Sequence, residues 1–375
     1  MNKILKRITW SGAVGINCEP TFEDKGADAR GIHPGKFGSQ YPRMAFFENG
    51  TWLIVYTVYR NNGYLADKNG GNTLVIAKSI DRGKTWTEIA QLSDPGRDLD
   101  NGQLLILTGQ TVLLACRSVI WQTSYKLYTY KSTDGGSTWA RIGLIDENSG
   151  ADEALGNPDR GVYEPHMLLL PDGSVSVMYA SEKEACANPA FSQIIVQKNS
   201  RDGGITWAEE GLPVRDTKNS SARPGMPVWD RLQNGEYILV YEIIATEGGD
   251  VFWKTSLNGI TWPDGIGNRI PEQKGGSFIL PLKEGGLLAT SNTHHVSISN
   301  DGGKSWIVNP DSPWETLWME AVDNGATCTV KDGNVWPAMY QINEREIVFV
   351  TSAGRKAGGN EIQFKVGTLI YEEQE

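Results

Sequence analysis

An eight-residue phrase, Ser-x-Asp-x-Gly-x-Thr/Ser-Trp, recurs along this 375-residue chain and limits the possible folds more than any other feature. Four intact copies begin at Ser79, Ser132, Ser200 and Ser299, and a fifth copy, Ser256–Trp262, is one residue short. Repetition at intervals of tens of residues is typical of repeat architectures, in which each copy belongs to one structural unit. We therefore expect one body of repeated units rather than two or three ordinary domains.

Each phrase is predicted to form a tight turn between two strands. The Asp side chain can accept hydrogen bonds from backbone N–H groups of the turn, Gly can adopt positive φ, and Trp can pack between neighbouring sheets. The 43 Gly and 13 Trp residues of the chain suit an all-β protein with many turns and many aromatic side chains between sheets.

A second repeat, an apolar strand followed by a turn and another apolar strand, lies between the phrases. Its six copies are Pro42–Tyr56, Leu104–Cys116, Pro165–Tyr179, Pro227–Tyr241, Phe278–Thr290 and Pro337–Val350. Six hairpins, five of them followed by a phrase, predict an all-β, six-bladed β-propeller of four-stranded antiparallel blades, with residues 1–375 as a single domain. The segment around Ile8 is expected to close the ring beside residues 363–370.

Strand direction divides the predicted loops between two rims. The hairpin turns and the repeated phrases share one rim, so Asp81, Asp134, Asp202 and Asp301 are expected there. The starts of the first strands and the ends of the second strands share the other rim. This second rim gathers the candidate site residues, namely Tyr41, Arg43, Asp98, Asp100, Asn101, Tyr163, Glu164, Arg223, Glu242 and Trp336.

The composition and net charge of the chain limit the classes of binding partner that we expect. The net charge is −10 and no basic stripe is visible, so neither nucleic acid nor an anionic membrane is an expected partner. No apolar run approaches the roughly 20 residues that span a bilayer. The N-terminus has no apolar stretch typical of a signal peptide, so we expect a cytoplasmic protein, or a secreted one if a cleaved leader precedes this sequence. The four Cys and four His residues lack metal-type spacing, so no metal or other cofactor is expected. We expect a monomer.

Two glutamates suit glycoside hydrolysis, which needs two carboxyl groups about 5–5.5 Å apart for retention of configuration and a wider separation for inversion. Glu164 starts one predicted first strand and Glu242 ends the second strand of the next blade, so both should reach the same rim. Glu242 follows an apolar run, which favours a raised pKa and a general acid/base role, whereas Glu164 lies near Arg160 and is expected to be the nucleophile. The alternative is that both are solvated rim carboxylates or ion-pair partners.

The other candidates each have a functional and a structural interpretation. Arg43 and Arg223 could hold a ligand, or they could hold the acidic side chains in place. Tyr41, Tyr163 and Trp336 could stack on a sugar ring, or they could pack between blades. Tyr340 is either a hydrogen-bond donor in the central channel, with a catalytic role, or a side chain that fills it.

The repeated phrase resembles the Asp box, or BNR repeat, of sialidase-like propellers. Six segments further resemble glycoside hydrolase family 93, the exo-acting α-1,5-L-arabinanases: Tyr41–Met44, Asp98–Asn101, Val162–Pro165, Ala222–Pro227, Tyr241–Glu242 and Val335–Pro337. The resemblance implies an oligosaccharide or polysaccharide substrate, release of arabinobiose from a chain end with retention, and Glu164 and Glu242 as the catalytic pair. Tyr163, Gly102 and Pro224 depart from the family pattern around the subsites, so the sugar is less well defined than the reaction.

Two other functions remain open, an exo-sialidase and a non-catalytic sugar-binding propeller. A sialidase needs three arginines around the substrate carboxylate, a Tyr nucleophile and an Asp acid/base. Arg43 suits the first arginine and Asp67 the aspartate, but Arg117, Arg223 and Arg355 lack the expected neighbouring phrases. Because acidic residues outnumber arginines on this rim, we expect a neutral furanoside rather than a sialic acid.

Overall fold

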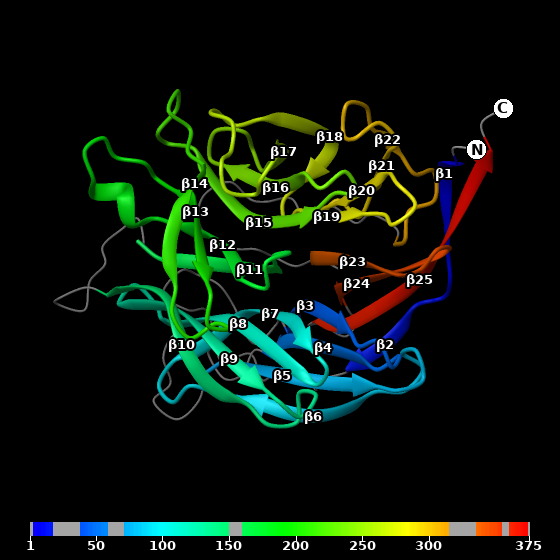
Figure 1. Ribbon diagram of the computed structural model, residues 1–375, viewed down its shortest axis with the longest axis horizontal. Coiled ribbons are helices and arrows are strands. Elements are labelled where there is room, and N and C mark those ends of the chain that lie inside the picture. The colour runs from blue at the N-terminus through cyan, green and yellow to red at the C-terminus, as the bar shows by residue number, and fades with distance from the viewer. Residues whose placement is uncertain are drawn as a thin grey trace.

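The computed structural model describes residues 3–17, 38–58, 71–149, 160–314, 335–354 and 360–373. Their strands form six sheets of four antiparallel strands arranged in a ring, with one further short strand at the edge of one sheet (Figure 1). The prediction of a six-bladed β-propeller is thereby confirmed. Within the described residues the only helix is the short 3-10 turn Lys183–Cys186.

The blades follow one another along the chain. Blade one comprises β3 (Ser39–Phe46), β4 (Trp52–Val58), β5 (Thr73–Ser79) and β6 (Thr87–Leu92). Blade two comprises β7 (Asp98–Thr108), β8 (Thr111–Ile120), β9 (Ser124–Ser132) and β10 (Ala140–Ser149). Blade three comprises β11 (Val162–Leu169), β12 (Val175–Ser181), β13 (Ile194–Ser200) and β14 (Ala208–Val214). Blade four comprises β15 (Arg223–Arg231), β16 (Tyr237–Ile244), β17 (Asp250–Ser256) and β18 (Asn268–Lys274). Blade five comprises β19 (Phe278–Pro281), β20 (Leu287–Thr290), β21 (Val296–Ser299) and β22 (Ile307–Val308).

Blade six joins the two ends of the chain. It contains β23 (Val335–Asn343), β24 (Glu346–Gly354), β25 (Asn360–Glu373) and the N-terminal strand β1 (Lys3–Trp10), and the short β2 (Val14–Asn17) also pairs with β25. Figure 1 shows β1 and β25 side by side with both chain ends near one another. Ile8 lies opposite Leu369 in this pairing, so the predicted closure beside residues 363–370 is confirmed.

The Asp boxes are turns held by their own side chains. In the second box, Asp134 Oδ1 accepts the backbone N–H of Thr138 at 2.9 Å and Asp134 Oδ2 accepts the Thr138 hydroxyl at 2.7 Å. Ser132 Oγ donates to Asp134 Oδ1 at 2.8 Å and accepts the N–H of Gly136 at 2.8 Å. In the other three intact boxes, the first Ser and the Thr or Ser before Trp likewise both donate to the Asp carboxylate. The hydrogen bonds of each turn are therefore supplied by its own residues.

The end of each box fits against the preceding blade. Trp207 Nε1 of blade three donates to Thr129 Oγ1 of blade two at 3.1 Å. Gly204 has φ +94°, and a Cβ there would lie 3.0 Å from the Thr129 methyl group. Gly therefore serves both the left-handed turn and the close approach of two sheets, and the predicted position of Trp between neighbouring sheets is confirmed.

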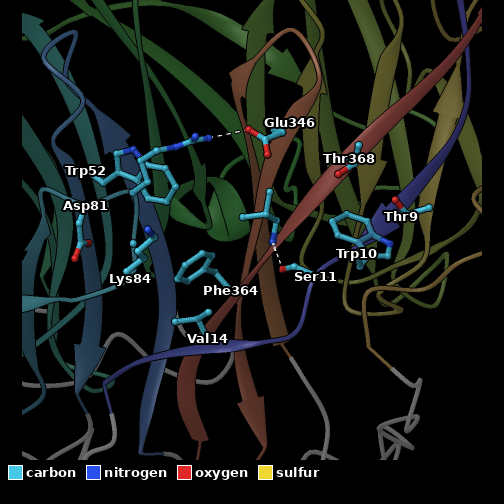
Figure 2. A pocket seen from close by; sticks show the side chains of 13 residues that line it. Thr9, Trp10, Ser11, Val14, Trp52, Asp81, Lys84, Glu346, Phe364 and Thr368 are labelled. Carbon is cyan, nitrogen blue, oxygen red and sulfur yellow. Dashed lines mark hydrogen bonds and ion pairs between the residues drawn. The ribbon is translucent and has the colours of Figure 1, made fainter.

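The joint between blade six and blade one carries an additional contact. A groove of about 570 Å³ lies between Trp10, Val14 and Phe364 on one side and Trp52 and the first Asp box on the other. Figure 2 shows the side chains that line it. Arg82 of that box has φ +61°, where the other intact boxes have glycine, and it forms a 2.7 Å ion pair with Glu346 of β24. This ion pair links blade one to blade six, the blade in which the two ends of the chain meet.

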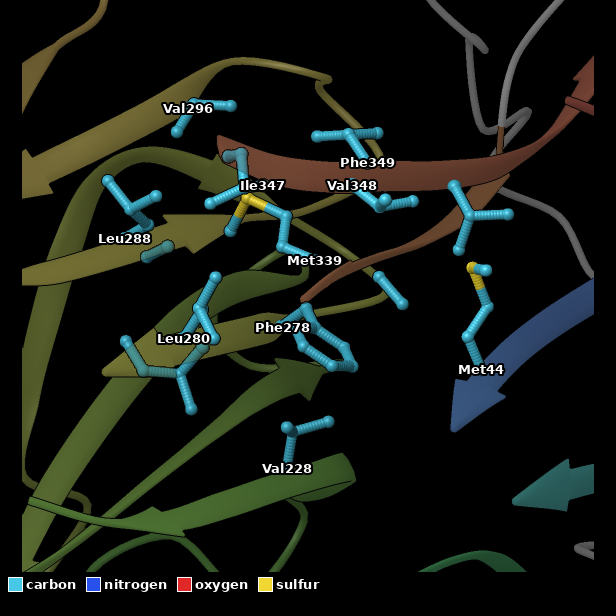
Figure 3. Packing of buried hydrophobic residues seen from close by; sticks show 14 of the residues in the cluster. Met44, Val228, Phe278, Leu280, Leu288, Val296, Met339, Ile347, Val348 and Phe349 are labelled. Carbon is cyan, nitrogen blue, oxygen red and sulfur yellow. The ribbon is translucent and has the colours of Figure 1, made fainter. Parts of the chain in front are cut away.

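Apolar side chains fill the spaces between blades. Figure 3 shows Val228 of blade four, Phe278 and Leu280 of blade five, Met339 of blade six and Met44 of blade one within a single cluster. Phe278, Leu280 and Met339 are all buried. The cluster therefore continues from blade four through blade six to blade one, and the adjoining blades are packed into one body.

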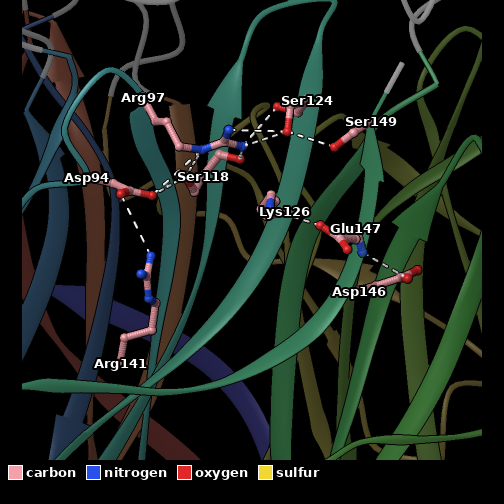
Figure 4. Close-up of polar contacts among 9 residues, drawn as sticks. All are labelled: Asp94, Arg97, Ser118, Ser124, Lys126, Arg141, Asp146, Glu147 and Ser149. Carbon is pink, nitrogen blue, oxygen red and sulfur yellow. Dashed lines mark hydrogen bonds and ion pairs between the residues drawn. The ribbon is translucent and has the colours of Figure 1, made fainter. Parts of the chain in front are cut away.

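Blade two also carries a polar network, which begins just before β7 and extends over β8, β9 and β10 (Figure 4). Arg97 Nε donates to Ser118 Oγ at 2.6 Å, and its guanidinium lies 3.7 Å from Asp94. On β10, Asp146 accepts the Tyr179 hydroxyl at 2.8 Å and pairs with Lys183 at 2.8 Å. These ion pairs connect neighbouring strands and blades outside the candidate site.

Candidate active site

A β-bulge interrupts the first strand of five blades close to its start. The bulged residues adopt positive φ, and they are Tyr41 (57°), Asn101 (52°), Glu164 (60°), Met226 (51°) and Trp336 (54°). Positive φ is uncommon for residues other than glycine, and bulges next to active sites re-aim side chains. Four of the five are followed by proline, so the sequence marks these bulges as X-Pro pairs on the predicted rim.

Contacts between blades pass from the end of each second strand to the start of the next first strand. The six pairs in ring order are Thr57 with Asp100, Arg117 with Tyr163, Glu182 with Arg223, Glu242 with Gly276, Asn292 with Trp336, and Ser352 with Tyr41. The contacts form a closed circle on one rim. Because third strands run parallel to first strands, the Asp boxes at their ends lie on the opposite rim, as the order of strands predicts.

The two candidate glutamates face the same space within this circle. Glu164 Oε2 accepts the backbone N–H of Met226 at 2.6 Å. Glu242 Oε2 accepts the N–H of Gly276 at 2.5 Å. A Cβ atom on Gly225 would lie 3.3 Å from Glu164 Oε2 and 3.9 Å from Glu242 Oε1. Glycine at position 225 therefore leaves room between the two carboxyl groups, and the structure brings the predicted pair together.

Both glutamates have raised pKa values because surrounding protein atoms disfavour their charged forms, although each keeps a partly exposed surface. Burial raises the pKa of Glu242 to about 8, and the negative charge of Glu164 adds to this increase. Burial also raises the pKa of Glu164, but the Met226 N–H group, Arg117 and Arg223 oppose that increase. Glu242 is thus suited to hold a proton while Glu164 is ionised.

Two ion pairs place positive charge beside Glu164. Asp100 Oδ2 accepts from Arg117 at 3.0 Å, and both side chains are nearly fully buried. Arg223 pairs with Glu182, whose side chain is 1% exposed. Tyr163 lies between the two pairs, with its ring 5.1 Å from the Arg117 guanidinium and its hydroxyl 2.8 Å from Glu182 Oε2. Arg223 and Tyr163 therefore have structural partners, and contact of either with a sugar stays a prediction.

Three other candidates cluster on blades one and six. Arg43 is 1% exposed, lies 4.0 Å from the centre of the Tyr41 ring and donates to the Trp336 carbonyl at 3.1 Å. Trp336 is half-buried, with its ring centre 6.2 Å from that of Tyr41. Burial raises the pKa of Tyr41 to about 12, so its hydroxyl stays protonated at ordinary pH. The contacts of Arg43 are with protein groups, and a direct contact with ligand stays a prediction.

Tyr340 lies on β23, between the first strands of blades one and five. Its hydroxyl accepts the N–H of Met44 at 3.0 Å, and its ring centre is 5.6 Å from that of Phe278. These contacts agree with the channel-filling interpretation, and a catalytic role for Tyr340 stays a prediction.

Asp98 and Asn101 are buried on β7, where Asp98 accepts the N–H of Asn72 at 2.7 Å. Asp67 and Arg355, considered for a sialidase site, lie outside the described residues.

Sequence reasoning did not assign roles to several residues around the pair. Gly225 leaves the space between the carboxyls, and Gln193 Nε2 borders the same position at 2.9 Å while donating to the Pro224 carbonyl. Gly276 supplies the backbone donor to Glu242. The phrase Arg-Pro-Gly-Met-Pro contained Gly225, and its Met-Pro pair matched other rim segments, so that signal was present in the sequence. Gln193 lies outside every repeat and carried no signal.

The described residues hold no cluster of three or more His, Cys, Asp or Glu side chains arranged to bind a metal ion. In the same part of the chain, no helix is long and apolar enough to cross a membrane. The arrangement offers two carboxyl groups with different proton affinities, backbone donors to each, and two arginines, which is a set of groups suited to acid/base and nucleophilic chemistry.

Comparison with known proteins supports the fold. A family model described as BNR repeat-like domain matches residues 42–262. No curated protein sequence matches the chain. Among solved structures, the chain is similar to a Penicillium chrysogenum α-L-arabinanase complexed with arabinobiose, with TM-score 0.73 and 22% identity over 96% of this chain and 98% of that one.

Two further solved structures show the same likeness. A family 93 α-L-arabinofuranosidase of Fusarium graminearum with arabinobiose gives TM-score 0.70 and 21% identity, over 95% of this chain and 97% of that chain. A Hadza microbial sialidase gives TM-score 0.59 and 12% identity, over 90% of this chain and 67% of that chain. At these identities the likeness shows a shared propeller fold.

Proposed function

This chain belongs to the family of BNR repeat-like domains, and on that premise we propose that it is a retaining, exo-acting glycoside hydrolase that releases arabinobiose from α-1,5-linked L-arabinan or its oligosaccharides. The observation that carries the proposal is the convergence of Glu164 and Glu242 beside Gly225, with a pKa of about 8 for Glu242. The arabinobiose complexes of the similar arabinanase and arabinofuranosidase support the choice of sugar.

In the proposed reaction, protonated Glu242 donates its proton to the glycosidic oxygen as the bond to the leaving sugar breaks. The ionised carboxylate of Glu164 attacks the anomeric carbon and forms a covalent glycosyl-enzyme. Glu242, now deprotonated, then takes a proton from water as that water attacks the same carbon and releases Glu164. Two displacements retain the configuration at the anomeric carbon.

The arginines favour a neutral sugar over a sialic acid. A substrate carboxylate would need several guanidinium groups free to face it. Arg117 is paired with Asp100, Arg223 with Glu182, and the buried Arg43 donates to the Pro42 and Trp336 carbonyls. A neutral furanoside avoids the cost of burying another negative charge beside two glutamates.

A substrate panel tests the function directly. Wild type and Glu164→Gln would be incubated with linear α-1,5-arabinan, a set of 4-nitrophenyl glycosides and a fluorogenic sialoside, with products separated by chromatography and the first-formed anomer identified by NMR. Release of arabinobiose as the retained anomer by wild type alone is expected. Release of sialic acid without arabinobiose would replace the proposal with a sialidase, and binding without turnover would favour a sugar-binding propeller.

A further inference from the structure

Glu182 is a buried carboxylate that the proposed reaction does not use. It follows β12 and its side chain is 1% exposed. Three donors surround it: the Arg223 guanidinium, the Tyr163 hydroxyl at 2.8 Å and the backbone N–H of Gly161 at 2.8 Å. Burial raises the pKa of Glu182, and its three donors oppose that increase. Removing the carboxylate would leave these donors without a matching acceptor.

Arg223, the ion-pair partner of Glu182, lies on β15 two residues before Gly225, the residue that adjoins both catalytic carboxyl groups. Its positive charge lowers the pKa of both Glu164 and Glu242. The Arg223 side chain is 32% exposed, so one side of it is open to solvent while the other side is anchored by Glu182. No other ion pair of Arg223 occurs within the described residues. Without Glu182, hydration would draw this guanidinium away from the pair.

Tyr163 connects the same anchor to the second arginine. Its hydroxyl donates to Glu182, and its ring lies beneath Arg117, which is held by Asp100. Tyr163 immediately precedes Glu164, so a movement of its ring would be passed to the backbone of the nucleophile. The chain of contacts therefore runs from blade two through Tyr163, the neighbour of Glu164, to blade four.

We propose that Glu182 is a positioning residue that holds Arg223 and Tyr163 against the Glu164–Glu242 pair and thereby sets the charge around both carboxyl groups. The proposal rests on the proposed glycosidase function for its effect on rate. Glu182 itself contacts neither of the two glutamates and acts through Arg223. Outside the site, Asp146 is a comparable carboxylate, because it also accepts a Tyr hydroxyl at 2.8 Å and forms ion pairs, in its case with two lysines.

The test is a double-mutant cycle with Glu182→Gln, Arg223→Gln and the double variant. If Glu182 acts through Arg223, each single variant lowers kcat/KM about 10- to 100-fold, and the double variant is little worse than Arg223→Gln. Loss of Arg223 from the pair raises both carboxyl pKa values, so both limbs of the pH profile move to higher pH. The proposal is overturned if the losses of the two single variants multiply in the double variant, or if the pH profile of kcat/KM does not move.

A second measurement does not depend on turnover. Carbon-13 NMR titration of the glutamate carboxyl groups, assigned with Glu164→Gln and Glu242→Gln, should show both pKa values rising in Glu182→Gln. Unchanged or lower values would mean that Arg223 stays in place without Glu182, and would overturn the proposal. Asp146→Asn is the control, because it also lowers stability but should leave both pKa values unchanged. If wild type hydrolyses none of the sugars, the proposed function fails, while this titration still decides the positioning role.

Discussion

The two rims of the propeller use carboxyl groups in opposite ways. On one rim, Asp134 and Asp301 are exposed and Asp81 is half-buried, and hydrogen bonds from Thr or Ser side chains and backbone N–H groups lower their pKa values to about 2. On the other rim, burial raises the pKa of Glu242 to about 8 and also raises that of Glu164. The same chemical group is a stabilised anion in one place and a proton carrier in the other.

The difference comes from the number of donors and the access of water. Each Asp of an intact box accepts bonds from a serine, from a Thr or Ser hydroxyl and from the backbone, all within its own turn. Glu242 accepts one backbone N–H and lies near a second carboxylate. In these acids, several local hydrogen bonds accompany a lowered pKa, whereas desolvation with one donor accompanies the raised pKa of Glu242.

The largest expected effect is a loss of activity from substitutions on the rim of Glu164 and Glu242 but not from those on the Asp-box rim. Glu164→Gln and Glu242→Gln should each lower kcat on the substrate identified by the panel about 10²- to 10⁴-fold, because each removes a group that attacks or transfers a proton. Asp134→Asn is the control and should keep wild-type kcat. If Asp134→Asn loses as much activity as the glutamate variants do, the distinction between the rims is wrong.

A smaller loss is expected when the space between the carboxyls is filled. Gly225→Ala adds a methyl group about where the built Cβ lies, 3.3 Å from Glu164 Oε2 and 2.9 Å from Gln193 Nε2. Displacement of the reacting groups should lower kcat/KM about 100-fold. The paired control is Gly15→Ala on β2, where a Cβ meets no atom within 4 Å and the backbone φ is not positive. Equal activity of Gly225→Ala and wild type would show that this space does not receive substrate.

The raised pKa of Glu242 has a consequence for stability. Its ordinary value is 4.5 and its folded value is about 8, so its contribution is fully present below pH about 4.5 and is lost as pH rises through about 8. Because Gln does not ionise, the Glu242→Gln variant does not lose this stability as pH rises. Its melting temperature should exceed that of wild type at pH 9 but not at pH 4.5. Thermal unfolding measured across that range checks the sign. In active wild type, kcat/KM should fall above pH about 8.

The smallest effect is expected on the Asp-box rim, with the opposite pH dependence. The folded pKa of Asp134 is about 2 against an ordinary 3.8, so its contribution is present above about pH 4 and is lost as pH falls towards 2. Asp134→Asn should therefore lower the melting temperature at pH 6 and have little effect near pH 2. A deficit of the same size at both pH values would mean that the carboxylate charge contributes nothing to the turn.

The repeats made most of the fold predictable. Each Asp box is held by hydrogen bonds within one short turn, such as those among Ser132, Asp134 and Thr138. The same residue types at the same spacing therefore predict the same turn elsewhere in the chain. The six hairpins followed from apolar patterning, and the N-terminal strand beside Leu369 followed from the need to complete blade six. Local hydrogen bonding and strand period are properties of neighbouring residues, and a sequence displays them directly.

The sequence by itself determined the repeated turns, the number of blades and the rim on which Glu164 and Glu242 lie. Only the tertiary structure decided which residues face them. Gly225, Gly276 and Glu182 come from separate segments, and their roles depend on how neighbouring blades meet. The pKa of Glu242 is likewise a tertiary property, because burial and the approach of Glu164 arise only when the blades pack around one channel.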